Sequence, residues 1–215
     1  ARPNLPIGVI FDWDNTLAEN WECVVLAYNA AREAFGHAPI SLAESYHHIQ
    51  GSLRDSFPIL FGDGVERARK IFYDTFAANH LRALRPIEHA EEVLGVLRSR
   101  HIPASILSNK SGDFLRKEVD HLGWSHYFGG SIGAGDAEED KPSPRAVDAA
   151  LLPIGLKANA DIWLVGDAPV DIQCARAAGC TGIFVSGGDM QRHAWGDGTV
   201  PQYSISTCKD LLEWL

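Results

Sequence analysis

Residues 6–18 read PIGVIFDWDNTLA, an apolar run that ends in two carboxylates. The apolar part, from Ile7 to Asp12, predicts a buried β-strand. Side chains two residues apart at a strand end project to the same side, so Asp12 and Asp14 should face one space. Because burying an ionised carboxylate without a partner is costly, a metal ion, a lysine or both should neutralise the pair. A turn rich in Asp and Asn that merely follows a strand is the alternative interpretation.

The bulk composition favours a globular protein and argues against several classes of partner. A chain of 215 residues with 46% hydrophobic residues can bury a core of its own. Its net charge of -9 argues against a nucleic-acid binder, which usually carries a basic face. No apolar run approaches the roughly 18 residues that a membrane helix needs. We therefore expect no nucleic-acid partner and no membrane contact. The sequence leaves open whether the protein is a monomer or a homodimer.

The cysteines show neither a CxxC pair nor a spacing with histidine that is typical of zinc sites. We interpret them as reduced, mostly buried thiols, which favours a cytoplasmic protein. The four are Cys23, Cys174, Cys180 and Cys208.

Apolar runs alternate with helical patterns through most of the chain. This alternation predicts an α/β fold with a doubly wound, Rossmann-like parallel sheet that is covered by helices on both faces. Ligands of such sheets bind at the carboxyl ends of the strands, where Asp12, Ser108 and Asp167 fall. The expected strands are 7–12, 102–107, 161–166 and 181–185, and the expected helices are about 88–100, 111–122, 143–152 and 169–178.

Residues 18–84 interrupt this alternation, because they contain helical patterns near 19–36, 41–50 and 64–81 but no convincing strand. We expect a small all-helical cap of residues 18–84, inserted after the first strand. The α/β core domain would then consist of residues 1–17 and 85–215.

One arginine of this presumed cap is a candidate for substrate binding. In Gln50-Gly-Ser-Leu-Arg54 a flexible glycine turn precedes a single guanidinium. Arg54 could pair bidentately with a second anionic group of a substrate, or it could be an ordinary helix-surface arginine.

Three later segments also carry polar groups at expected strand or helix ends. Ser108 offers a hydroxyl, with backbone amides behind it, that could bind an oxyanion or cap a helix. Lys141 follows three acids and precedes a proline, and its local sequence alone would suggest a solvated surface lysine. Asp167 and Asp171 bracket the first turn of a helix that begins near Pro169, where they could hold a divalent cation together with the carboxylates of the opening stretch.

Together, and in this order, these segments resemble the four motifs of the haloacid dehalogenase-like superfamily. The presumed helical cap, the run Ser108-Asn109-Lys110 and the run Lys141-Pro-Ser-Pro are also similar to the subgroup that includes phosphoglycolate phosphatase. The first motif matches Asp12, Asp14 and Thr16, the second Ser108, the third Lys141, and the fourth Asp167 with Asp171.

The resemblance implies a phosphatase that acts on a small phosphorylated metabolite with Mg2+. Asp12 would attack phosphorus and become an aspartyl-phosphate, while Asp14 would transfer protons. The Mg2+ ligands implied are Asp12, Asp167, Asp171 and the main-chain carbonyl of Asp14. Ser108 and Lys141 would hold phosphoryl oxygens, and the further substrate-binding candidates are Thr16, Asn109, Lys110 and Arg54.

The chain departs from the family pattern at three positions near the motifs. Asn15 replaces a frequent glycine, although asparagine tolerates left-handed backbone. Ala168 replaces a frequent serine or threonine, and Trp13 is bulkier than usual, with a side chain that should face away from the carboxylates.

Three other activities are compatible with the resemblance. A 2-haloacid dehalogenase needs neither a metal nor the second aspartate, so Asp14 and Asp167 argue against it. A phosphomutase of the phosphoglucomutase-like subgroup often has valine or a similar residue where this chain has Thr16. A catalytically silent phosphate-binding scaffold is disfavoured because every reacting residue is present.

Overall fold

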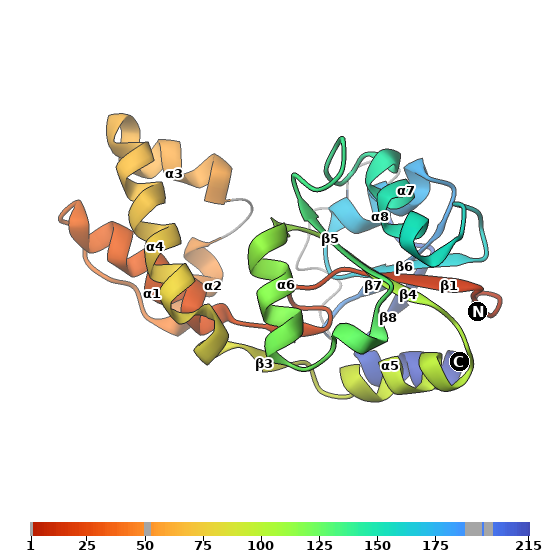
Figure 1. The fold of residues 1–215 in the computed structure, drawn as a ribbon. Coiled ribbons are helices and arrows are strands. Elements are labelled where there is room, and N and C mark those ends of the chain that lie inside the picture. Colours follow the sequence, from red (N-terminus) through yellow and green to blue (C-terminus); the bar gives the residue numbers. More distant parts are fainter. Residues whose placement is uncertain (1, 50–52, 188–194, 196–199) are drawn as a thin grey trace. The chain divides into compact units, whose positions relative to one another are not determined.

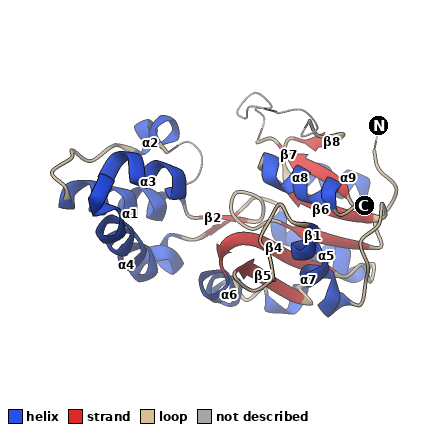
Figure 2. Ribbon diagram, turned by 90° about the horizontal axis from the view of Figure 1, so that it is seen from above, coloured by secondary structure: helices blue, strands red, loops and turns tan. Residues whose placement is uncertain are grey.

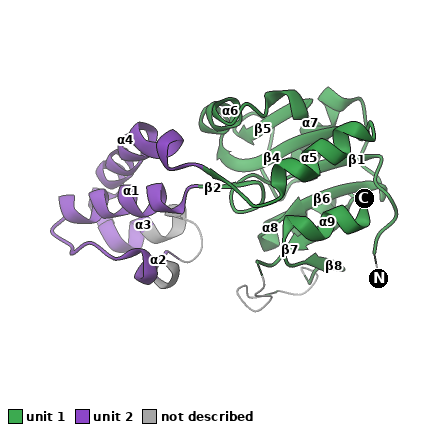
Figure 3. Cartoon of the chain, turned by 90° about the horizontal axis from the view of Figure 1, so that it is seen from below, with its two compact units in different colours: residues 1–19, 85–215 green, residues 20–84 purple. Residues whose placement is uncertain are grey.

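The computed structural model describes residues 2–49, 53–187, 195 and 200–215. The chain forms two compact units, one of residues 1–19 and 85–215 and the other of residues 20–84 (Figure 3). The expected division placed the first boundary after residue 17, two residues earlier, and the second boundary before residue 85.

Unit 1 is built on a six-stranded sheet in which every neighbouring pair of strands is parallel (Figures 1 and 2). The order is β5-β4-β1-β6-β7-β8, so the chain moves outward from β1 in both directions. The strands are β1 (Gly8–Phe11), β4 (Ala104–Ser111), β5 (Gly130–Ala134), β6 (Ile162–Gly166), β7 (Thr181–Val185) and β8 (Tyr203–Ile205). The predicted doubly wound parallel sheet is confirmed.

Two strands of the sheet were not among the four expected. β5 has the sequence GSIGA and β8 the sequence YSI. Both lie at the edges of the sheet, and neither has the continuous apolar run that identifies a central parallel strand.

Helices cover both faces of the sheet in unit 1. α7 and α8 pack together on one face, α5 and α9 pack together on the other, and α6 lies against β4 and β5 (Figure 1). These helices are α5 (Ala90–Ser99), α6 (Gly112–His121), α7 (Pro144–Leu151), α8 (Pro169–Ala177) and α9 (Cys208–Trp214), with short 3-10 turns at Ser125–Tyr127 and Leu152–Ile154. Among the described residues, no helix combines the length and apolar character needed to cross a membrane.

The core of unit 1 lies between the central strands and these helices. Ile10 of β1 and Leu164 of β6 are fully buried and pack in one apolar cluster with Val147 of α7. Burial on both faces explains why these strands are nearly continuous apolar runs. A rigid sheet therefore carries the polar residues that follow its strand ends.

Unit 2 is all helical, as its sequence predicts. It contains α1 (Trp21–Ala34), α2 (Leu42–His48), α3 (Leu53–Phe61), a 3-10 turn (Gly62–Gly64) and α4 (Val65–Ala83). An aromatic core joins α3 to α4, where Phe57 and Phe72 meet edge to face with ring centroids 5.6 Å apart. α3 was not expected, because Pro58 lies inside it.

The chain leaves and re-enters unit 1 through two short strands. β2 (Ala18–Glu19) and β3 (Arg85–Pro86) pair antiparallel, with Ala18 opposite Pro86 and Glu19 opposite Arg85. This pair holds the two ends of the inserted helical unit side by side, immediately after the Asp12–Asp14 segment.

Candidate active site

The candidate site lies at the carboxyl ends of β1 and β6, the neighbouring strands at which the winding of the sheet reverses direction. Asp12 follows β1 directly, and its backbone N–H donates to the carbonyl of Val165 at 2.8 Å. Asp167 follows β6. The sheet therefore brings two carboxylates from segments far apart in the sequence together at the carboxyl ends of its central strands.

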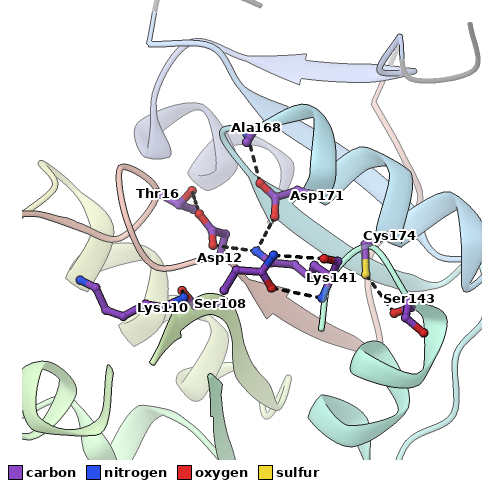
Figure 4. Close-up of polar contacts among 10 residues, drawn as sticks. Asp12, Thr16, Ser108, Lys110, Lys141, Ser143, Ala168, Asp171 and Cys174 are labelled. Atoms are coloured by element: carbon purple, nitrogen blue, oxygen red, sulfur yellow. Dashed lines mark hydrogen bonds and ion pairs between the residues drawn. The ribbon is translucent and has the colours of Figure 1, made fainter. Parts of the chain in front are cut away.

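A tight turn after Asp12 shapes the first motif. The backbone N–H groups of Thr16, Leu17 and Ala18 all donate to the carbonyl of Trp13, at 3.2, 3.0 and 3.2 Å. Asn15 adopts a left-handed φ of 61°, which confirms that asparagine meets the conformational demand at this position. The turn brings the Thr16 hydroxyl back to donate to Oδ2 of Asp12 at 3.3 Å (Figure 4).

Lys141 neutralises Asp12 and is not a surface lysine. Its Nζ lies 2.8 Å from Oδ1 of Asp12 and 2.7 Å from Oδ1 of Asp171, and its side chain is 2% exposed (Figure 4). Burial by itself would lower the pKa of Lys141, but the two carboxylates outweigh burial and raise that pKa above its ordinary value. The ammonium therefore stays charged between them.

Asn109 fixes the backbone of Lys141. Its Oδ1 accepts from the Lys141 N–H and its Nδ2 donates to the Lys141 carbonyl, both at 3.1 Å. Its amide thus pairs with the main chain of another motif, whereas the sequence suggested a substrate-binding role. The thiol of Cys174 donates to the carbonyl of Ser143 at 3.4 Å and anchors the same loop to α8.

Asp171 belongs both to the site and to the start of α8. Its Oδ2 accepts from the N–H of Ala168 at 3.1 Å, which is the half of a capping box that needs no side-chain oxygen on the N-cap residue. Gly166 permits this close packing, since a Cβ there would lie 2.2 Å from Cγ of Asp171. Burial raises the pKa of Asp171, Lys141 lowers it in part, and the nearby charge of Asp12 raises it further.

Three buried carboxylates meet at this edge and fit a hard divalent cation. Oxygen atoms of Asp12, Asp167 and Asp171 all lie within 4.8 Å of one another. One ammonium, that of Lys141, lies among them, so at least one negative charge remains for a cation to balance. Carboxylate oxygens are the donors that Mg2+ prefers. The side chain of Asp14 is not part of this cluster.

Ser108 lies on β4 and not at a helix start. β4 continues to Ser111, its register with β5 shifts between Leu107 and Ser111, and α6 begins only at Gly112. The expectation that the strand ends at residue 107 is therefore wrong. Ser108 as a residue is 3% exposed, and its hydroxyl accepts from the backbone N–H of Lys110 at 3.1 Å, which leaves the hydroxyl proton available to an anion.

Lys110 pairs with carboxylates of the protein itself. Its Nζ lies 2.7 Å from Oδ1 of Asp14 and 2.7 Å from Oε2 of Glu118. Burial raises the pKa of Asp14, Lys110 opposes this in part, and Glu118 and Asp12 add to the rise. Both aspartates of the opening stretch therefore have a lysine of their own, a different one for each.

The comparison with known proteins agrees with this geometry. Residues 9–185 match the family described as haloacid dehalogenase-like hydrolase. The chain belongs to this family.

The relatives of this hydrolase include proteins named phosphoglycolate phosphatase and a protein named pyrophosphatase. It is 30% identical to a phosphoglycolate phosphatase of Neisseria gonorrhoeae, over 96% of this chain and 92% of that protein. It is 25% identical to pyrophosphatase PpaX of Halalkalibacterium halodurans, over 95% and 94% of the two chains. It shares the fold of a predicted phosphoglycolate phosphatase from Haemophilus somnus, with a TM-score of 0.82, 20% identity and 96% coverage of each chain.

Glu118 of this hydrolase is a site residue that sequence reasoning missed. It is fully buried on α6, in a stripe with the buried residues Leu115 and Val119. A glutamate in the apolar stripe of a helix is the signal that would have identified it, because a buried carboxylate needs a partner.

Arg54, the remaining predicted site residue, lies in the first turn of α3. Its side chain falls outside the part of the hydrolase that the structure describes.

Proposed function

We propose that this hydrolase is a Mg2+-dependent phosphatase that cleaves a small phosphomonoester of the phosphoglycolate type through an aspartyl-phosphate. The observation that carries the proposal is the different environment of the two aspartates of the opening stretch. Asp12 is buried among two further carboxylates and Lys141. Asp14 stands apart, with a side chain that is 37% exposed. Such a division suits one nucleophile and one proton carrier.

The first half-reaction transfers the phosphoryl group to the protein. A carboxylate oxygen of Asp12 forms a bond to phosphorus while the bond from phosphorus to the ester oxygen breaks. The electron pair of the broken bond goes to the ester oxygen, which takes a proton from the carboxyl group of Asp14. The alcohol leaves, and Asp14 remains as a carboxylate.

The second half-reaction restores the protein. Water attacks phosphorus and gives its proton to Asp14, while the bond from phosphorus to the oxygen of Asp12 breaks and its electron pair returns to the Asp12 carboxylate. Phosphate leaves, and both aspartates regain their starting states.

The other residues of the site act on charge and position. Lys141, which lies beside Asp12, and the Ser108 hydroxyl would hold phosphoryl oxygens, and Thr16 would orient Asp12 through its hydrogen bond. Asn109 holds the Lys141 backbone. Mg2+ bound by Asp12, Asp167, Asp171 and the main-chain carbonyl of Asp14 would supply positive charge to the phosphoryl oxygens.

The structure bears on the alternative activities. A dehalogenase would need neither Asp14 nor a metal, so a buried group of three carboxylates that can hold a cation, Asp12, Asp167 and Asp171, favours a phosphatase. A phosphomutase would return its phosphoryl group to a sugar, which an assay for released phosphate distinguishes. A silent scaffold would show no turnover at all.

Removal of the metal should strongly reduce activity. We expect turnover of phosphoglycolate and p-nitrophenyl phosphate with Mg2+, and a loss of at least about tenfold in excess EDTA that added Mg2+ reverses, because the carboxylates would otherwise repel the phosphate. Phosphate release is measured for both substrates and for pyrophosphate, since one relative is named a pyrophosphatase. Undiminished turnover in EDTA contradicts the metal assignment, and pyrophosphate as the preferred substrate contradicts the monoester assignment.

Arg54→Ala should reduce activity selectively, if this arginine binds the carboxylate of phosphoglycolate. A desolvated, charge-assisted contact contributes about 1.5–3 kcal/mol, so kcat/KM for phosphoglycolate should fall roughly 10–150-fold while p-nitrophenyl phosphate is spared. The control is Arg82→Ala, an exposed arginine of α4. Equal losses on both substrates would mean that Arg54 supports the fold or closure of the helical unit and does not bind the carboxylate. No loss on either substrate would mean that Arg54 is an ordinary surface arginine.

A further inference from the structure

A second buried ion pair lies beside the site, and the phosphatase chemistry does not by itself require it. Lys110 and Glu118 meet through Nζ and Oε2 at 2.7 Å, with side chains that are 9% and 0% exposed. Burying two opposite charges is costly and seldom stabilises a fold by itself. A pair of this kind at the edge of an active site therefore calls for a role.

The pair is connected to the proton carrier. Nζ of Lys110 also lies 2.7 Å from Oδ1 of Asp14. Of the described residues, only Lys110 bonds to the Asp14 carboxylate through its side chain. One oxygen of Asp14 is thus held, and the other oxygen of this partly exposed side chain is left for the reacting group.

Glu118 is itself held rigidly. Its Oε2 accepts from Nε1 of Trp13 at 2.7 Å as well as from Lys110, and its backbone lies in the interior of α6. Trp13 is fully buried and packs edge to face on Trp124, with ring centroids 6.0 Å apart. Trp13 also lies between Asp12 and Asp14 in the sequence, so its contacts with Glu118 and Trp124 hold the backbone of the first motif. Lys110, which shares Glu118 with Trp13, holds the side chain of Asp14.

We propose that Lys110, anchored by Glu118, is a positioning residue that fixes the Asp14 carboxylate for proton transfer to and from the reacting oxygen. This role rests on the proposed phosphatase function. It also gives a reason for the bulky Trp13, whose indole N–H shares Glu118 with Lys110. Small errors in the placement of a proton carrier are costly, about 100-fold for roughly 1 Å.

The test exploits leaving groups of different basicity. p-Nitrophenolate leaves without a proton, whereas the alkoxide of a simple alkyl phosphate such as ethyl phosphate needs one. Lys110→Met should therefore lower kcat/KM for ethyl phosphate roughly 10–100-fold, and that for p-nitrophenyl phosphate by no more than a few-fold. The control is Lys117→Met, which removes an exposed lysine of α6, the helix that carries Glu118.

A second variant guards against misfolding. Lys110→Met alone leaves Glu118 buried without this cation, so the double variant Lys110→Met with Glu118→Gln removes both charges together and keeps an acceptor for Trp13. We expect the same selective loss in the double variant. In an Asp14→Asn background, Lys110→Met should cost no more than a further few-fold, because its effect passes through Asp14.

Each other outcome has a definite meaning. Equal losses on both substrates, or a full additional loss in the Asp14→Asn background, would overturn the positioning role and leave the phosphatase function standing. Wild-type activity combined with no loss in either Lys110 variant would also overturn it. A wild-type protein that hydrolyses neither of these substrates nor phosphoglycolate would overturn the proposed function, and this inference with it.

Discussion

Asp12→Asn should abolish turnover and the covalent intermediate together. The amide that replaces the carboxylate is a poor nucleophile and lacks the negative charge that Lys141 balances at 2.8 Å. Loss of the nucleophile of a hydrolase lowers kcat by roughly 10⁶-fold, so the residual rate should lie at the limit of detection. The fold should persist, because Asp171 still holds the buried ammonium of Lys141.

Acid quench of a reaction with radiolabelled substrate measures the intermediate directly. Wild-type protein should carry one acid-stable, base-labile phosphoryl group, and Asp12→Asn should carry none. Asp120→Asn, an exposed carboxylate on α6, is the matched control and should behave as wild type. Label recovered on any other residue would refute the assignment of Asp12.

Asp14→Asn should give a different defect, in which the protein is phosphorylated but fails to turn over. Asparagine keeps the shape of the side chain but can neither give nor take a proton, a contribution of roughly 10²–10⁴-fold in kcat. With p-nitrophenyl phosphate the first half-reaction needs no acid, so the block should fall on hydrolysis of the aspartyl-phosphate. With ethyl phosphate both half-reactions should be slowed.

Rapid mixing distinguishes these steps. Asp14→Asn should release a burst of p-nitrophenol close to the concentration of protein and then stop almost completely, whereas Asp12→Asn should show no burst. The phosphorylated form should accumulate in the same reaction. A variant that keeps wild-type kcat on both substrates would remove Asp14 from the mechanism, and absence of the burst would place its main role in the first half-reaction.

These two effects differ because the two carboxylates of one short stretch have different surroundings. Asp12 shares Lys141 with Asp171 and lies in the cluster that suits a cation. Asp14 is held through a single oxygen by Lys110 and is partly exposed. The same residue type can thus act as nucleophile at one position and as proton carrier two residues later.

The sequence by itself determined the fold class, the inserted helical unit and most of the site. Long apolar runs at regular spacing identify central parallel strands, since burial on both faces leaves no other pattern. The polar residues that follow those runs must gather at one edge, because parallel strands end on the same side. Asp12, Ser108 and Asp167 could therefore be grouped before any contact was known, whereas Lys141 joined them only through the resemblance to the haloacid dehalogenase-like superfamily.

Only the tertiary structure decided which charge meets which. The sequence alone makes Lys110 and Asn109 candidates for substrate contact. In the structure Lys110 contacts Asp14, and Asn109 contacts the backbone of Lys141. The edge strands β5 and β8 were also not predicted from the sequence, because they contain few apolar residues. Such partners are set by packing between segments that lie far apart in the chain.

Glu118 shows the physical reason most clearly. A helical pattern fixes which face of α6 is buried, but it does not state what a glutamate on that face will touch. The partner depends on where β4 ends and on how α6 packs against the sheet, and these place Lys110 and the indole of Trp13 at the same carboxylate oxygen. Periodicity along one helix therefore predicts that the charge is buried, and only the packing of α6 against β4 and the first motif decides what neutralises it.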